Sequence, residues 1–262
     1  MDSVAGGWSK SRSPTSVEED LIAAVTRSPL RHHPFDHVYL EEVFAPDTYS
    51  DMLAEMPDDA FFHQLVHRDA LRRDGTSTRL RMYLYPELLR RLPEPQRRTW
   101  MPVAQALCSS EVQRAFKAKF KAALEDRFCK PVERIRLYPI PILLRDQPGY
   151  RIGIHADVPT KAITVQFYLP RDSSQRRIGT IFHEGRDGDG AARTTQMQFM
   201  PATGYAFPVT AQKSWHSAAR TEERDRERIS MMVTYYVTEK PLLWAKLRLR
   251  RAALRFGIHP KG

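Results

Sequence analysis

The chain has 262 residues, of which 42% are hydrophobic, 10% aromatic and 27% charged. This composition is that of a globular protein with a substantial core, and it excludes a wholly disordered or fibrous chain. The two cysteines, Cys108 and Cys129, can build neither a disulfide scaffold nor a cysteine-based zinc site. No apolar run is long enough to span a bilayer, so we expect a cytoplasmic protein.

The formal net charge of +10 is distributed unevenly. Residues 239–262 contain seven basic residues and one acidic residue, and so carry +6 of that total. A nucleic-acid partner would be expected if the charge covered a folded face, but most of it lies in one terminal segment. We therefore predict no nucleic-acid partner.

The first half of the chain has mainly helical patterns. Residues 1–16 show little periodicity and predict a flexible lead, whereas residues 17–130 predict a mainly helical support region. Within that region a strand-like segment precedes a short helix that starts at Pro46. Residues 57–95 are mixed and polar, and they predict no element.

A stripe of helical period runs through residues 94–128. Its members are Val112, Phe116, Phe120, Leu124 and Phe128. We interpret this stripe as the core-facing side of helical structure, because lysines occupy the positions beside it.

After residue 130 the pattern changes to eight short runs rich in β-branched and aromatic residues. No helical segment separates these runs, so residues 131–240 predict an antiparallel sandwich or jelly roll rather than a parallel α/β sheet. Residues 241–262 then form a basic helix or tail. The predicted fold class is an all-β core with a helical N-terminal part, α+β overall.

Two motifs in the β-region carry histidines. His155 and Asp157 are two residues apart, so in a strand their side chains point to the same face and can reach one metal ion. His216 follows in a later strand that can return beside the first. Two histidines and a carboxylate bind non-heme Fe(II) with open positions, although zinc hydrolases use the same set.

Arg228 stands at the head of the last apolar run. An arginine there is oddly placed unless its guanidinium meets an anion, since its planar fork suits a carboxylate.

In this order, His155, Asp157, His216 and Arg228, the sequence resembles the Fe(II)/2-oxoglutarate-dependent dioxygenases, especially their prolyl-hydroxylase-like branch. The resemblance covers about residues 131–238. It implies a double-stranded β-helix, the cupin-like jelly roll of that family, and an enzyme that uses Fe(II), 2-oxoglutarate and O2 as cofactor and cosubstrates. It also implies hydroxylation of a C–H bond with release of succinate and CO2.

The resemblance assigns roles residue by residue. His155, Asp157 and His216 would hold the iron and be the catalytic centre, and Arg228 would bind the 5-carboxylate of 2-oxoglutarate. Tyr168 falls where relatives have a tyrosine that binds the same carboxylate, and Thr164 would line that pocket. Halogenases of the family have Gly or Ala at the position of Asp157, so halogenation is disfavoured.

The substrate is not specified by these motifs. We expect a small molecule, such as an amino acid, a sugar or envelope glycolipid, or a natural-product intermediate. Basic residues near the strand ends are compatible with an anionic substrate; they are Lys161, Arg171, Arg176, Arg177 and Arg186. A protein side-chain hydroxylase and a non-catalytic metal-binding jelly roll with a basic interaction tail are the alternatives.

Residues 241–256 predict a helix with basic residues beside an apolar stripe. One interpretation is peripheral contact with anionic lipid at the inner membrane face. The interpretation we favour is a helix packed on the β-domain with an exposed cationic side. The oligomeric state is not predicted.

Overall fold

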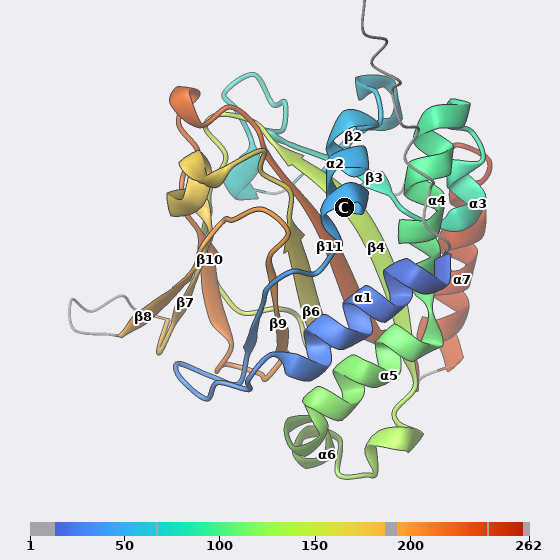
Figure 1. The fold of residues 1–262 in the computed structure, drawn as a ribbon. Helices are drawn as coiled ribbons and strands as arrows, with labels where there is room; N and C mark the ends of the chain where they lie inside the picture. Colours follow the sequence, from blue (N-terminus) through green and yellow to red (C-terminus); the bar gives the residue numbers. More distant parts are fainter. Residues whose placement is uncertain (1–13, 67, 187–192, 240, 259–262) are drawn as a thin grey trace, which may run out of the picture.

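The computed structural model describes residues 14–66, 68–186, 193–239 and 241–258. Within these residues the strands form two antiparallel sheets that pack face to face (Figure 1). The larger sheet has the order β1-β9-β6-β11-β4-β3-β2, and the smaller has the order β5-β10-β7-β8. The strands are β1 (Val38–Leu40), β2 (His63–Gln64), β3 (Arg79–Tyr83), β4 (Leu137–Asp146), β5 (Ile152–His155), β6 (Lys161–Tyr168), β7 (Thr180–His183), β8 (Thr194–Met197), β9 (Gly204–Pro208), β10 (Trp215–Ala218) and β11 (Arg228–Val237).

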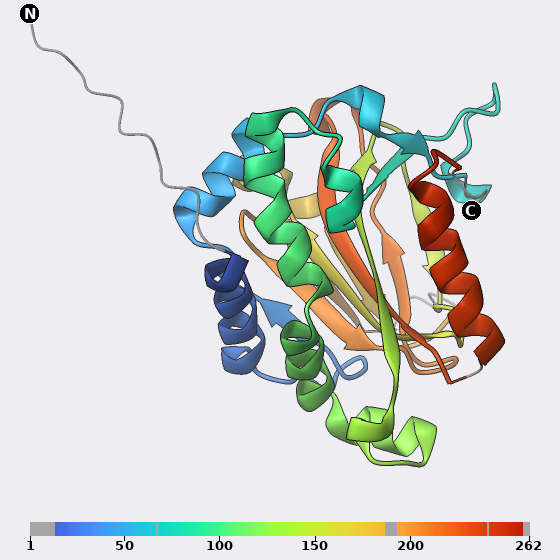
Figure 2. The ribbon, with the colours of Figure 1, turned by 90° about the vertical axis from the view of Figure 1, so that its right-hand side faces the viewer.

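Helices cover the outer face of the larger sheet, where α1, α4 and α5 lie against it (Figure 2). The helices are α1 (Pro14–Arg27), α2 (Pro46–Ala54), α3 (Pro86–Leu89), α4 (Glu94–Cys108), α5 (Ser110–Lys119), α6 (Lys121–Phe128) and α7 (Pro241–Leu254). None of the helices in the described part of the chain is long and apolar enough to cross a membrane.

The central strand β11 shows why the two faces of the larger sheet differ. Met231, Val233 and Tyr235 point outward into the core beneath the helices. The alternate residues, which include Arg228 and Thr234, point to the inner face. The outer face of the larger sheet is therefore a packed apolar layer, and the polar side chains of β11 lie on the inner face.

The inner face is covered by two different elements. The smaller sheet packs over β6 and β9 through an aromatic cluster. Helix α7 covers the other half, because Leu254 joins Tyr83 and Leu144 of β3 and β4 in one apolar cluster. A bidentate ion pair between Arg251 and Glu87 also holds α7 in place.

The structure confirms the predicted jelly roll and its eight strands, since the described part of residues 131–240 contains β4 to β11. Val112, Phe116, Phe120 and Leu124 are buried, so the helical stripe is core as predicted. The support region also supplies β1, β2 and β3 to the larger sheet. Most of the predicted lead, residues 1–13, lies outside the described residues, and residues 14–16 belong to α1.

Candidate metal centre

The smaller sheet brings His155, Asp157 and His216 together. Strands β5 and β10 are antiparallel neighbours, and their register places His216 directly opposite His155. Asp157 follows β5 by two residues. The ligand atoms of the three side chains all lie within 4.8 Å of one another, and the two imidazole ring centroids are 4.2 Å apart.

Each histidine is oriented by its own backbone. The Nδ1 atom of His155 lies 3.0 Å from the carbonyl of Gly153, and that of His216 lies 3.0 Å from the carbonyl of Ser214. Since a carbonyl oxygen only accepts, both Nδ1 atoms must carry the proton, which leaves Nε2 as the free lone pair. Burial lowers the pKa of His216 to about 4, so this ring is neutral near pH 7 and able to bind a metal.

Asp157 completes the set with a charged oxygen pair. Its side chain is 6% exposed. Lys161 donates to one carboxylate oxygen at 2.5 Å, and Thr164 donates to the other at 2.6 Å. Burial raises the pKa of Asp157, but Lys161, His216 and these hydrogen bonds outweigh that effect and leave it below its usual range. The carboxylate is thus ionised and fixed in orientation.

Two histidines that offer Nε2 and one ionised carboxylate fit a divalent transition metal such as Fe(II). The orienting hydrogen bonds are the kind of support that metal ligands in proteins usually have.

A second cluster of polar side chains lies on the inner face, around Arg228 at the start of β11. Arg228 is 1% exposed; it donates to the carboxylate of Asp146 at 2.9 Å and to the carbonyl of Ile178 at 3.0 Å. Arg79 binds the same carboxylate through two nitrogens. Two guanidinium groups therefore share one carboxylate, and this buried cluster has one positive charge in excess.

Tyrosines line this charged cluster. The Arg228 guanidinium lies 5.5 Å from the ring centroid of Tyr168, whose hydroxyl donates to the carbonyl of Met197 at 3.3 Å. The Arg79 guanidinium lies 4.2 Å from the ring centroid of Tyr150. The Tyr150 hydroxyl is buried and has no hydrogen-bond partner among the described residues. Burial raises the pKa of Tyr150, so the hydroxyl remains protonated as an unused donor.

The sequence-predicted residues thus fall into two groups. His155, Asp157, His216 and Thr164 form the metal cluster, whereas Arg228 and Tyr168 lie together at the charged cluster. Sequence reasoning missed Arg79, Asp146 and Tyr150, which reach the cluster from β3, β4 and the loop after β4. The spacing of these residues carried no signal, because only strand pairing brings them together.

The predicted anion-binding cations are in part used elsewhere. Lys161 binds Asp157, and Arg177 binds Asp225 and Glu222. His183 lies outside the metal cluster, and its Nε2 atom shares a hydrogen bond with the Ser217 hydroxyl at 2.8 Å.

No family model matches the sequence, and no curated protein matches it. Solved structures do match the fold. A prolyl hydroxylase from Trichoplax adhaerens, solved with a hypoxia inducible factor peptide fragment, has a TM-score of 0.51 at 9% identity, over 85% of this chain and 90% of that one. A prolyl-4-hydroxylase from Pseudomonas putida has a TM-score of 0.50 at 13% identity, over 84% and 98% of the two chains. The dioxygenase for auxin oxidation in rice has a TM-score of 0.51 at 13% identity, over 86% and 79%. The chain therefore has the jelly-roll fold of these oxygenases, as predicted.

Proposed function

We propose that this protein is an Fe(II)- and 2-oxoglutarate-dependent dioxygenase that hydroxylates a C–H bond of a small molecule and releases succinate and CO2. The observation that carries the proposal is the cluster of His155, Asp157 and His216, with both imidazoles oriented to offer Nε2. The shared fold with solved oxygenases supports it.

His155, Asp157 and His216 would hold the metal, and Thr164 and Lys161 would keep the Asp157 carboxylate in position. Bound Fe(II), together with 2-oxoglutarate, supplies the activation of O2. The chain itself holds the ligands, keeps His216 neutral in a buried position and shields the centre between the two sheets.

The charged cluster suits the far carboxylate of 2-oxoglutarate. Arg228 and Arg79 bring two positive charges and Asp146 one negative charge, so one further carboxylate balances the group. The Tyr150 hydroxyl is buried and has no partner among the residues that the structure describes, and such a donor is costly unless a ligand satisfies it. We therefore add Tyr150 to the cosubstrate-binding residues Arg228 and Tyr168.

A small-molecule substrate is favoured over a protein side chain by the position of α7. This helix lies over the inner face beside β3 and β4 and covers a cavity of about 250 Å³, whose mainly apolar lining is typical of small-molecule sites. The prolyl hydroxylase from Trichoplax adhaerens was solved with a peptide, so a protein side chain remains the alternative substrate.

The direct test is anaerobic mixing of the apo-protein with Fe(II) and 2-oxoglutarate. We expect a visible metal-to-ligand charge-transfer band in the wild type and none in His155→Ala. Folded protein that binds iron without this band would instead indicate a non-catalytic metal-binding jelly roll. Binding of Zn²⁺ with hydrolytic activity and no band would indicate the zinc alternative.

We further propose that the outer side of α7 contacts a membrane peripherally, on a protein located in the cytoplasm. Leu242 and Leu249 are 83% and 70% exposed and lie seven residues apart, on one side of the helix, and Phe256, 81% exposed, lies two residues after the end of the helix. Exposed Lys246 and Arg248 lie among them and suit anionic lipid. The opposite side of α7 packs on the core through Leu247 and Leu254.

A further inference from the structure

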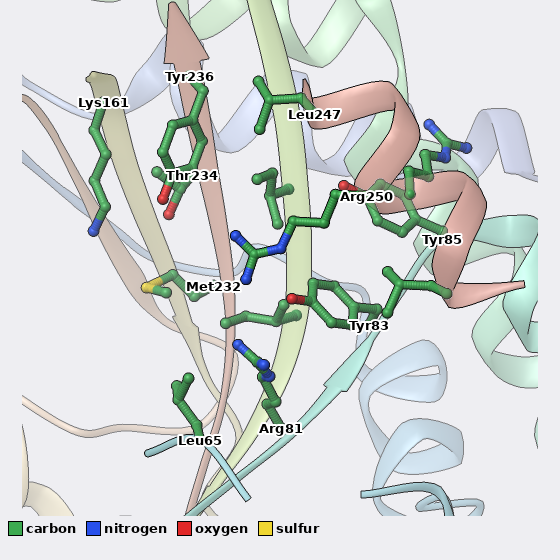
Figure 3. Close-up of a pocket in the computed structure, with 14 residues that line it drawn as sticks. Leu65, Arg81, Tyr83, Tyr85, Lys161, Met232, Thr234, Tyr236, Leu247 and Arg250 are labelled. Carbon is green, nitrogen blue, oxygen red and sulfur yellow. The ribbon is translucent and has the colours of Figure 1, made fainter. Parts of the chain in front are cut away.

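A cavity of about 250 Å³ lies on the inner face of the larger sheet beneath α7 (Figure 3). Its walls are mostly aliphatic and aromatic, with Ile142 and Met232 from the sheet, Leu247 from the helix, and the rings of Tyr83 and Tyr236. Such a lining, with a few polar groups, is typical of small-molecule sites.

This cavity adjoins the metal cluster. Lys161 lines the cavity and binds the carboxylate of Asp157. Thr234, which also lines it, is paired in register with Thr164, the other hydrogen-bond donor to Asp157. A molecule in the cavity therefore has one end beside the metal ligands.

Two guanidinium groups enter the cavity at its far side. Figure 3 shows Arg81 reaching in from β3 and Arg250 from α7, toward the same space beside Tyr83. Two further cations line the cavity: Lys161 binds Asp157, and Arg251 binds Glu87. No acidic side chain lines this cavity in the part of the chain that the structure describes.

Both guanidinium groups lie in an apolar part of the protein. The Nε atom of Arg250 is buried and has no hydrogen-bond partner among the described residues. Burial lowers the pKa of Arg81, and the charge of Arg250 adds to the lowering while Tyr83 opposes it. Two like charges beside each other in an apolar cavity favour an anion between them.

We infer that Arg81 and Arg250 form a subsite for an oxyanion of the substrate, a carboxylate, sulfate or phosphate at the end of an apolar body. This inference rests on the proposed function and names its substrate class. Strands β6 and β3 are three positions apart in the sheet, which is about 14 Å at a spacing of about 4.8 Å. The substrate is thus an elongated organic anion whose charged end lies away from the carbon that reacts.

The test uses metal-free full-length protein and matched probes, 4-phenylbutyrate and the neutral 4-phenylbutyramide, in titration calorimetry. We expect the acid to bind at least about tenfold more tightly than the amide, as a charge-assisted contact predicts. The phosphate and sulfate esters of 3-phenylpropanol then rank the oxyanions and identify the preferred head group.

Arg250→Met and Arg81→Met should each remove the preference for the anion, with circular dichroism confirming the fold. Arg248→Met is the matched control, because Arg248 is on the same helix but stacks on Trp244 outside the cavity. Equal binding of acid and amide, a preference that survives Arg250→Met, or its loss in Arg248→Met would overturn the inference.

The charge-transfer band separates this inference from the proposed function. A band with no anion preference refutes only the subsite. An anion preference with no band refutes the oxygenase and leaves an anion-binding cavity beside a metal cluster.

Discussion

The side chains of the metal cluster are arranged by short-range contacts that a substitution can remove one at a time. His155 and His216 each use Nδ1 on a carbonyl two residues upstream, so the strand conformation itself selects the tautomer. Asp157 differs, because its partners Lys161 and Thr164 come from β6, a strand of the larger sheet. Replacement of Asp157 therefore affects both the proposed metal site and a buried ion pair.

Asp157→Ala should abolish succinate formation, since the metal loses its one anionic ligand. The unpaired Lys161 is expected to lower the free energy of unfolding by about 1–3 kcal/mol, which denaturation with urea measures. Lys161→Ala is the control, because it breaks the same ion pair but keeps the ligand set. Full turnover in Asp157→Ala would remove the carboxylate from the metal site.

Tyr150→Phe should raise the 2-oxoglutarate concentration needed for half-maximal turnover by about tenfold, because a hydrogen bond to a charged group is lost. The maximal rate should change little. Tyr235→Phe is the matched control, since Tyr235 is equally buried and its hydroxyl also lacks a partner in the described part of the chain, but it lies in the core on the outer face. A similar effect of both substitutions would mean that the Tyr150 hydroxyl has no special relation to the cosubstrate.

Among the elements, the β-region was the most predictable from sequence. Strands β4 to β11 have alternating or continuous apolar patterns bounded by turn residues, and all were expected. Strand β3 was not, because its residues Arg79 to Tyr83 are buried on both faces and include two arginines. Arginine within a strand suggests an exposed loop unless its partner is known, and here the partner Asp146 is 67 residues away. The charged cluster and the cavity depend on β3, so neither could be predicted.

Helix α7 is held by an ion pair whose strength depends on pH. Burial raises the pKa of Glu87, but the hydrogen bond and charge of Arg251 outweigh it and leave the pKa below its usual range. Because the pKa of Glu87 is lower in the folded protein than in the unfolded chain, where it is about 4.3, the ionised carboxylate stabilises the folded state at pH values above about 4.3. This stabilisation is lost as the pH falls through the pKa of the folded state.

We therefore predict that Glu87→Gln lowers the hydrogen-exchange protection of residues 241–254 about tenfold near neutral pH. The wild type should lose the same protection on acidification below about pH 4, and the variant should not. Glu94→Gln, which breaks the exposed pair with Arg98, is the control. Unchanged protection in Glu87→Gln would show that apolar packing alone holds α7.

At the scale of the whole molecule, exposed basic side chains and exposed apolar side chains occur together on α7. We predict that the protein co-sediments with vesicles of anionic phospholipid at low salt and less with neutral vesicles. Leu249→Ser should weaken this binding roughly tenfold, because one leucine side chain is lost from the interface. Leu71→Ser, which changes another exposed leucine, should not. Absence of sedimentation at low salt would reject membrane contact.

The smaller sheet and α7 cover different halves of the inner face of the larger sheet. The proposed metal and cosubstrate sites therefore lie on other elements than the proposed substrate wall. The metal cluster and the charged cluster are built by strands and the loops that follow them, whereas the single helix α7 supplies one wall of the cavity and Arg250. If the proposed function and anion subsite hold, exchange of that segment alone is expected to change which anion is accepted and to leave the metal cluster unaltered. Chimaeras that differ only after residue 240 should keep their iron and cosubstrate affinities and diverge in the compounds that they accept.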